Sequence, residues 1–319
     1  MRVGLKIFTG NSNPALALSI TKYMGIPLGN AEVGHFSDGE TQVEFRENVR
    51  GMDVFVVQST CSPVNDNIME LLVMVDALKR ASASRVTAVM PYYGYARQDR
   101  KVASRAPITA KLVADIITAA GADRVLTIDL HAGQIQGFFD IPLDHLYAGP
   151  IIGEDLRSRG LCGDDAVVVS PDVGGVTRAR SLAEQLGSPL AIIAKRRPEP
   201  NQVQILEIVG DVAGRTCVMI DDMIDTGGSI VKGAEALIAR GATAVHACCT
   251  HGILSGNAVA QVASSPLASL LVTDTVPPLE DAGPKIRVVS VAPMLADAIQ
   301  RIHANSSVSE LFGGYSRPT

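Results

Sequence analysis

The sequence predicts an α/β protein built from mainly parallel sheets with helices packed on them. Short apolar runs rich in β-branched residues alternate with longer stretches whose apolar residues recur every three or four positions. This alternation is typical of consecutive β-α-β units with right-handed crossovers. The 319 residues contain more strand-like runs than one sheet of ordinary size holds, so we expect two domains. The turn signals Gly149 and Pro150 place the join near residues 146–150.

Each predicted element follows from its local pattern. The strand runs are mostly continuous apolar segments, as expected for parallel strands covered on both faces. In chain order they are 53–58, 85–91, 125–130, 166–170, 191–194, 218–220, 244–249, 269–273 and 287–291. The helical stretches between them carry an apolar stripe. In chain order they include 66–82, 108–120, 176–186, 229–240 and 294–302.

Composition argues against several classes of function. The formal net charge of −5 leaves no broad basic surface for nucleic acid. No apolar run approaches the roughly 20 residues of a membrane span, and the N-terminal segment turns polar too early for a signal peptide. The five cysteines show no paired spacing, which is typical of a reducing compartment. We therefore expect a cytoplasmic protein without nucleic-acid or membrane partners.

The stretch HACCTH at 246–251 has the composition of a metal site but not its geometry. In a strand, His246 and Cys248 face one way while Cys249 and His251 face the other. Four ligands then cannot converge on one ion, and no zinc-motif spacing is met. We interpret the stretch as a buried strand that ends in polar residues.

The stretch VMIDDMIDTGGS at 218–229 predicts a binding site for a phosphorylated sugar. Its apolar run ends in Asp221 and Asp222, at the carboxyl end of a strand, where open α/β sheets bind ligands. The turn that follows offers backbone N–H groups and hydroxyls to a phosphate at a helix start. It comprises Asp225, Thr226, Gly227, Gly228 and Ser229. The acids suit sugar hydroxyls or a magnesium ion, so we infer ribose 5-phosphate, with a simple tight turn as the alternative.

Three other polar loops are candidates for nucleotide binding. Residues 91–101 crowd cations with aromatic rings, as expected for a polyanion carrying an aromatic base, or for a solvated loop. The cations at 195–197 are either a solvated charge run or a group that closes on a transferring phosphoryl group. Residues 35–40 are a turn that can hold a nucleobase. The sequence has neither a G-x-x-x-x-G-K-S/T P-loop nor a G-x-G-x-x-G motif. Any bound ATP would therefore need cationic side chains and a metal to hold its phosphates, with Asp129, His131 and Asp172 as candidate magnesium ligands.

Seven motifs in order resemble those of the ribose-phosphate diphosphokinases, or phosphoribosyl pyrophosphate synthases. They are FSDGE at 36–40, PYYGYARQDRK at 91–101, SRAPITAKLVAD at 104–115, DLHAGQIQGFFDIP at 129–142, SPDVGG at 170–175, KRRPEPN at 195–201 and DDMIDTGGS at 221–229. The match covers essentially the whole chain, and its spacing is similar to the phosphate-activated class. The resemblance implies two tandem phosphoribosyltransferase-like domains. It also implies Mg²⁺-dependent transfer of the diphosphoryl group of ATP to the 1-hydroxyl of ribose 5-phosphate, releasing AMP.

The resemblance further assigns roles to residues. It places Lys195, Arg197 and His131 at catalytic positions, and His131, Asp172 and Asp129 at magnesium positions. The ribose 5-phosphate positions are Asp221, Asp222, Asp225, Thr226, Gly227, Gly228 and Ser229. The ATP positions are Phe36, Asp38, Gly39, Glu40, Arg97, Gln98 and Asp99. Phe36 is expected to stack on the adenine of a neighbouring subunit.

The implied organisation is a first domain over 1–148 with the ATP loops and a second over 149–305 with the ribose 5-phosphate site and a flexible catalytic loop. A tail over 306–319 is expected to pack back on the first domain. The implied assembly is a homo-oligomer, expected to be a hexamer, with shared ATP sites. A regulatory phosphate or ADP site would use Asn48, Arg50, Arg105, Ser307 and Ser309. Asn48 stands where the family usually has serine, which puts phosphate activation and ADP inhibition in question.

Two other functions share part of this pattern. A phosphoribosyltransferase would keep the 221–229 site but would not need the loops at 91–101 and 195–201. A non-catalytic subunit related to the synthases would carry altered catalytic loops, whereas this chain keeps Lys195, Arg197 and both acids.

Overall fold

The computed structural model describes residues 4–196 and 205–312, which pack into two compact units. The first unit contains residues up to Leu146 together with Thr275–Pro277 and Ser290–Leu311. The second contains Tyr147–Asp274 and Pro278–Val289, with Phe312. Within the described ranges, no helix is both long enough and apolar enough to cross a membrane.

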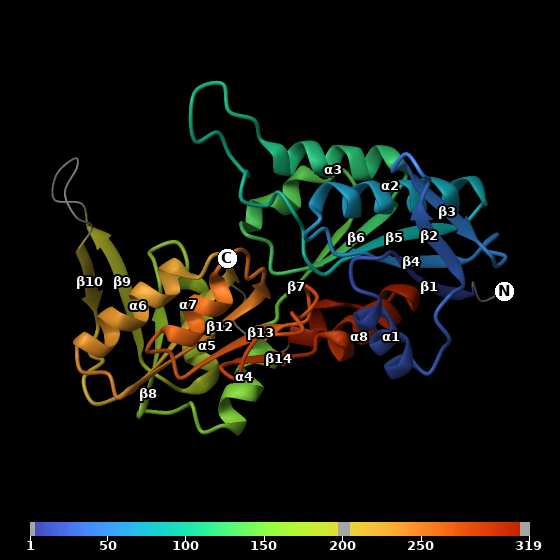
Figure 1. Cartoon of the computed structure of the whole chain (residues 1–319). Coiled ribbons are helices and arrows are strands. Elements are labelled where there is room, and N and C mark those ends of the chain that lie inside the picture. The colour runs from blue at the N-terminus through green and yellow to red at the C-terminus, as the bar shows by residue number, and fades with distance from the viewer. Residues whose placement is uncertain (1–3, 197–204, 313–319) are drawn as a thin grey trace. The chain divides into compact units, whose positions relative to one another are not determined.

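The first unit is built on a five-stranded sheet whose strands all run parallel. Their order is β1 (Leu5–Thr9), β4 (Asp53–Val57), β5 (Arg85–Met90), β6 (Arg124–Ile128) and β7 (Leu143–Leu146). Because successive strands from β4 onward add in one direction, right-handed crossovers place their helices on one face. These helices are α2 (Val64–Arg80) and α3 (Thr109–Ala120), while α1 (Pro14–Met24) and α8 (Ala292–His303) lie on the other face (Figure 1).

A separate antiparallel hairpin, β2 (Ala31–His35) and β3 (Thr41–Phe45), lies beside α2. Its inner face is anchored by apolar packing, because Val33, Val43 and Phe45 contact the core of the first unit. The Phe45 ring meets the Phe8 ring edge-on, with centroids 4.7 Å apart. The hairpin therefore projects its five-residue turn, 36–40, away from a fixed base. A short 3-10 helix, Gly133–Phe138, follows β6.

The second unit has a seven-stranded sheet whose strand order reverses in the middle. The order is β10 (Ile205–Val209), β9 (Leu190–Arg196), β8 (Ala166–Ser170), β11 (Thr216–Ile224), β12 (Ala244–Gly252), β13 (Ser269–Thr273) and β14 (Ile286–Val289). Only the β9–β10 pair is antiparallel. From β8 the chain moves outward through β9, and from β11 it moves the other way. This reversal creates a switch point between β8 and β11, where such sheets bind ligands.

The reversal also distributes the helices of the second unit over both faces of the sheet. Helices α4 (Gly149–Ser158) and α5 (Val176–Leu186) contact each other on one face, and α6 (Gly228–Ala239) and α7 (Ala258–Ser264) pair on the other (Figure 1). Since α5 follows β8 and α6 follows β11, both helices begin at the switch point. Their first turns can therefore face a common ligand.

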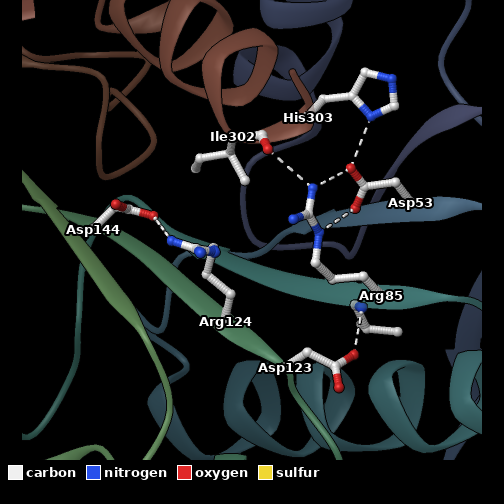
Figure 2. Close-up of polar contacts among 8 residues, drawn as sticks. Asp53, Arg85, Asp123, Arg124, Asp144, Ile302 and His303 are labelled. Atoms are coloured by element: carbon white, nitrogen blue, oxygen red, sulfur yellow. Dashed lines mark hydrogen bonds and ion pairs between the residues drawn. The ribbon is translucent and has the colours of Figure 1, made fainter. Parts of the chain in front are cut away.

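Helix α8 belongs to the first unit although it follows the last strand of the second. It packs along α1, and its last turn is held by a polar cluster at β4 and β5 (Figure 2). Arg85 binds both oxygens of Asp53 at 2.8 and 2.5 Å and donates to the Ile302 carbonyl at 3.0 Å. His303 Nδ1 lies 2.8 Å from Asp53 Oδ2. This division differs from the expected second domain over 149–305, because contacts rather than chain order place α8.

The predicted fold class of two α/β domains built on mainly parallel sheets is confirmed, and all nine predicted strands and five predicted helices occur. One prediction was wrong in a way that matters for the site. Asp221 and Asp222 do not follow the strand but lie within β11, which continues to Ile224 because Asp221 and Met223 still pair with β12. The pattern also missed elements, including β1, β7, β10, α1 and α4.

Candidate active site

Two adjacent carboxylates form the centre of the candidate sugar site at the switch point of the second unit. Asp222 is buried and Asp221 is partly exposed. Arg178, in the first turn of α5, places Nη1 3.5 Å from Oδ1 of both acids. The Asp222 backbone N–H also donates to Asp221 Oδ1 at 2.9 Å. One cation thus neutralises only part of the pair, and sequence reasoning did not select Arg178.

Burial and the neighbouring Asp222 carboxylate raise the pKa of Asp221 to about 7, against an opposing effect of Arg178. The side chain of Asp221 is 29% exposed, so water moderates the shift. The two acids titrate as a pair, and the direction of the shift means that they share a proton more readily than isolated aspartates. A ligand that offers hydroxyl donors or positive charge would favour the fully ionised pair.

Because the pKa of Asp221 is raised in the folded protein, the stability of the protein depends on pH. An Asp221→Asn substitution should remove this contribution. An unfolded aspartate ionises near pH 4, whereas Asp221 in the folded protein ionises near pH 7. The stabilising contribution of its retained proton is therefore present below pH 4 and lost as the pH rises to 7, by at most about 4 kcal/mol. As the pH rises from about 4 to about 7, the stability of the variant should therefore increase relative to that of the unmodified protein. Urea unfolding at a series of pH values would measure this difference. Parallel pH profiles of the two proteins would contradict this assignment.

The start of α6 forms a cradle suited to phosphate beside these acids. Gly227 caps the helix with a φ of +81°, a conformation that side chains other than glycine rarely adopt. A cavity of about 240 Å³ opens there, lined by Thr226, Gly228, Ser229 and Lys232 together with Pro171, Ile193 and Leu206. The free N–H groups of a helix start and the Lys232 ammonium both favour an anion. Lys232 was not selected from the sequence, although its place near the start of a helix after a glycine pair is visible there.

Asp225 and Asp172 both have structural hydrogen bonds at this edge. Asp225 accepts from the Ser255 hydroxyl, and its carbonyl accepts from the Ser255 N–H at 3.0 Å. Asp172 Oδ1 accepts from the Gly175 N–H at 2.9 Å, just before α5 begins. Both acids thus lie at the edge of the sheet that carries the candidate sugar site, and their roles stay predictions.

Lys195, one of the predicted catalytic residues, lies at the end of the antiparallel ribbon β9–β10. The backbone of Lys195 lies in β9, directly opposite Leu206, which lines the cavity at α6. Arg197 lies outside the described residues. The ribbon therefore brings position 195 to the side of the phosphate cradle.

The first unit contains a second candidate site, at the loop after β5. A cavity of about 320 Å³ is lined by Tyr92, Gly94, Tyr95, Arg97 and Gln98 together with Val64 and Asn65 at the start of α2. The loop packs closely against the segment after β4, since a Cβ on Gly94 would lie 2.4 Å from the Thr60 carbonyl oxygen. Arg97 and Gln98 thus line one cavity.

The aromatic residues of this loop are not all available to a ligand. Tyr93 is buried and donates its hydroxyl to the Ala110 carbonyl at 2.7 Å, so it belongs to the core. Tyr95 lines the cavity and donates to Asn65 Oδ1 at 2.6 Å. Asp99 accepts from Gln134 Nε2 at 2.6 Å and does not line the cavity. Tyr93 is therefore a core residue and is not available to contact a base.

The hairpin turn that carries Phe36 is held together by its own backbone. The Phe36 N–H donates to the Glu40 carbonyl at 2.8 Å, and the Glu40 N–H donates to Asp38 Oδ1 at 3.2 Å. Phe36 is 50% exposed, and Asp38, Gly39 and Glu40 are exposed as well. None of these four residues lines the cavity that holds Arg97 and Gln98. Within one described chain, the predicted ATP residues thus form two separate groups.

The predicted metal ligands do not form a cluster in the described parts of the chain. Asp129 is buried with a φ of +40°, and His131 is exposed, both after β6 in the first unit. Asp172 lies in the second unit. No group of three or more acidic, histidine or cysteine side chains that could hold a metal occurs among the described residues.

The residues predicted for regulation lie in the first unit in small local groups. Asn48 Oδ1 accepts from the Arg50 N–H at 3.0 Å, and Arg50 Nη1 donates to Ser82 Oγ at 3.1 Å. The hydroxyls of Ser307 and Ser309 are 2.9 Å apart. Arg105 is exposed on a turn with a φ of +65°. Asn48 thus uses its side-chain oxygen within its own turn.

A switch-point sheet with paired acids and a glycine-started helix defines an α/β protein of the phosphoribosyltransferase-like class. Two family profiles agree with this class: "N-terminal domain of ribose phosphate pyrophosphokinase" matches residues 5–121, and "Phosphoribosyl synthetase-associated domain" matches residues 196–313. Proteins named ribose-phosphate pyrophosphokinase are similar over nearly the whole chain. The chain therefore belongs to the ribose-phosphate pyrophosphokinase family and is an enzyme of that class.

The similarity to individual relatives is high. The ribose-phosphate pyrophosphokinase of Caldanaerobacter subterraneus subsp. tengcongensis is 59% identical over 97% of this chain and 98% of its own. That of Clostridium tetani is 59% identical over 98% of both chains. The crystal structure of phosphoribosylpyrophosphate synthetase from Mycobacterium smegmatis matches with a TM-score of 0.90 and 44% identity, over 95% of this chain and all of that one.

Proposed function

We propose that this enzyme transfers the diphosphoryl group of ATP to the 1-hydroxyl of ribose 5-phosphate, forming phosphoribosyl pyrophosphate and AMP. The observation that carries this proposal is the switch point of the second unit. There, Asp221 and Asp222 lie at one strand and a phosphate cradle begins at the next helix. Carboxylates and a phosphate cradle side by side match a ligand with hydroxyls at one end and phosphate at the other.

In this proposal, Asp221 and Asp222 accept hydrogen bonds from the ribose hydroxyls, and Arg178 limits the repulsion between the two acids. The turn at 225–229 binds the 5-phosphate through backbone N–H groups, with Thr226, Ser229 and Lys232 at the cavity wall. Binding at both ends orients the 1-hydroxyl. That orientation supplies much of the catalysis, because phosphoryl transfer needs positioning more than a strong base.

ATP is proposed to enter with its phosphates near Arg97, whose cavity also contains Gln98. The 1-hydroxyl oxygen attacks the β-phosphorus, the bond from that phosphorus to the oxygen of the α-phosphate breaks, and the hydroxyl proton is released. Lys195 and Arg197 are assigned to the charge that develops on the transferring group. His131, Asp38, Glu40 and Asp99 keep their predicted roles as part of this proposal.

Magnesium fits the described residues as an ion that arrives with ATP. Mg²⁺ keeps several waters and binds through one or two carboxylates plus substrate phosphates, so a cluster of protein ligands is not required. Asp129, His131 and Asp172 are the proposed protein contacts, directly or through water. When bound, the ion would neutralise phosphate charge and orient the diphosphoryl group.

We also propose a cytoplasmic homo-oligomer, expected to be a hexamer, in which Phe36 of one chain serves the nucleotide site of another. The separation of the exposed turn 36–40 from the cavity at Arg97 supports this sharing. The proposed organisation keeps the ATP loops in the first unit and the sugar site in the second. The regulatory set of Asn48, Arg50, Arg105, Ser307 and Ser309 is proposed as a binding site for phosphate or ADP.

The reaction is tested by incubating the purified protein with ATP, Mg²⁺ and ribose 5-phosphate and measuring AMP and phosphoribosyl pyrophosphate. We expect the two products in equal amounts. Product formation only from added phosphoribosyl pyrophosphate and a nucleobase would indicate a phosphoribosyltransferase. Binding of ATP without any turnover would indicate a regulatory subunit.

An Asp222→Asn substitution should weaken ribose 5-phosphate binding by about 10- to 100-fold, because a hydrogen bond to a charged acceptor is lost. ATP binding should change by less than about threefold, since Asp222 lies in the second unit's sugar site. Calorimetric titration of each ligand measures the two affinities. Asp211→Asn, an exposed acid of the same unit, serves as the control. Equal losses for both ligands would point to a shared metal role instead.

A further inference from the structure

We propose that Glu70 and Asn11 are positioning residues for nucleotide binding, because together they hold the β2–β3 hairpin and its turn 36–40 in place. The inference rests on the proposed function, in which that turn contacts ATP. Neither residue has a role in the mechanism described above. Both belong to the first unit, at the end of the sheet where β1 and β4 finish.

Glu70 is a buried carboxylate with only hydrogen-bond donors around it. It lies on α2, is 2% exposed, and makes no ion pair with any described residue. Its oxygens accept from Gln58 Nε2 at 2.8 Å, from the Asn11 backbone N–H at 3.0 Å and from Asn11 Nδ2 at 2.8 Å. Removing a carboxylate from water is costly, so these donors must be fixed in place for the acid to be tolerated. Glu70 thereby orients the amide of Asn11.

The same Asn11 amide group reaches the hairpin. Asn11 Nδ2 donates to the Val33 carbonyl in β2 at 3.1 Å, two residues before the strand ends at His35. The hairpin's other hydrogen bonds to flanking segments lie at its base, such as the Asn30 N–H to Glu47 Oε1 at 2.6 Å. Among described residues, the Asn11 bond is therefore the hydrogen bond from another segment to the hairpin that lies closest to the turn. Its loss would let the turn move while the apolar base stays packed.

Glu70 also connects this contact to the nucleotide cavity. Gln58 Nε2, held by Glu70, lies 3.2 Å from the Asn67 carbonyl, and Asn67 Nδ2 donates to the Cys61 carbonyl at 2.8 Å. The cavity residues Val64 and Asn65 lie between these two positions of the chain. One buried acid thus fixes both the cavity loop and the hairpin. We infer that the hairpin branch, through Asn11, determines the affinity for ATP.

A pair of substitutions can separate the hairpin branch from the rest of the network. Glu70→Gln places an amide donor opposite the Asn11 amide donor, and Asn11→Asp places two carboxylates together. The double variant exchanges donor and acceptor, so residue 70 donates to residue 11 and the other contacts at residue 70 keep an acceptor. In the double variant, however, a carboxylate oxygen faces the Val33 carbonyl, and the hydrogen bond to the hairpin is lost.

The experiment compares the full-length protein with both single variants and the double variant. We expect each single variant to lower the midpoint of urea unfolding and the double variant to recover most of that loss. In the double variant the KM for ATP should rise about 3- to 10-fold, as for one lost hydrogen bond, with an unchanged KM for ribose 5-phosphate. Amide hydrogen exchange in residues 31–45 should accelerate by a similar factor.

Three outcomes would overturn the inference: no recovery of stability in the double variant, recovery with an unchanged KM for ATP, or an equal rise in both KM values. Asn11→Ala supplies a second variant without a new charge, and it should also raise the KM for ATP selectively. Failure of the proposed function is distinguishable, because the unsubstituted protein would then form no phosphoribosyl pyrophosphate. In that case hydrogen exchange alone still decides whether Asn11 holds the hairpin.

Discussion

Lys195→Ala should lower kcat by about 10²- to 10⁴-fold while leaving the affinity for ribose 5-phosphate nearly unchanged. We assign Lys195 to charge that develops only during transfer of the diphosphoryl group, and such contacts act on the transition state more than on bound substrate. Its backbone position opposite Leu206, at the edge of the sugar-phosphate cavity, supports this role. Steady-state kinetics with each substrate varied in turn would measure both parameters.

Arg240→Ala is a suitable control, because it removes an exposed cation at the end of α6, in the same unit. Its kcat should stay within about twofold of the unmodified enzyme, as for a surface charge of little energetic weight. If Lys195→Ala instead raises the KM for ribose 5-phosphate at constant kcat, Lys195 binds substrate and does not act in the chemical step.

Phe36→Ala should raise the KM for ATP by about 5- to 100-fold, the equivalent of one lost base-stacking contact. The ring is 50% exposed at the tip of a polar turn, so its removal should leave the core of the first unit intact. Unfolding measurements would confirm that stability is retained. A KM for ATP that stays unchanged would exclude a stacking role for Phe36.

Mixing Phe36→Ala chains with Lys195→Ala chains tests whether sites are shared between subunits. Each variant alone should be poorly active. Mixed oligomers should recover activity, because some sites then combine an intact Phe36 from one chain with an intact Lys195 from another. The control mixes Phe36→Ala with the Phe36→Ala/Lys195→Ala double variant, where no chain has an intact Phe36. Confirmed subunit exchange without recovery would show that Phe36 serves its own chain.

Local patterns were sufficient to predict nine of the strands and to mark the paired acids of the candidate sugar site, although they missed β1, β7 and β10. Continuous apolar runs marked β8, β11 and β12, and the DDMIDTGGS segment marked the helix start. Arg178 could not be found in this way, since nothing in the sequence of its helix distinguishes it from an arginine at the surface, although its side chain is largely buried. Only the reversal of strand order brings α5 beside β11, and strand order is a property of the whole sheet.

Burial was also beyond local reasoning at several positions. Tyr93 and Tyr95 are separated by one residue in a loop, yet one is buried in the core and the other lines the cavity. In the sequence alone, Glu70 looks like an ordinary acid on an amphipathic helix. Its role depends on Asn11 and Gln58, which the fold brings to it from the segments that follow β1 and β4.

The return of helix α8 to the first unit has a consequence for the order in which the protein forms. Chains usually complete their N-terminal domain while the rest is still being synthesised. Here the apolar face of α8, which includes Leu295 and Ile299, covers the first sheet, and its last turn is held by Asp53 and Arg85. Helix α8 is synthesised only after all the strands of the second unit. The first unit is therefore completed late, so a nascent chain halted before residue 292 would leave the part of the sheet that α8 covers open to chaperones and proteases.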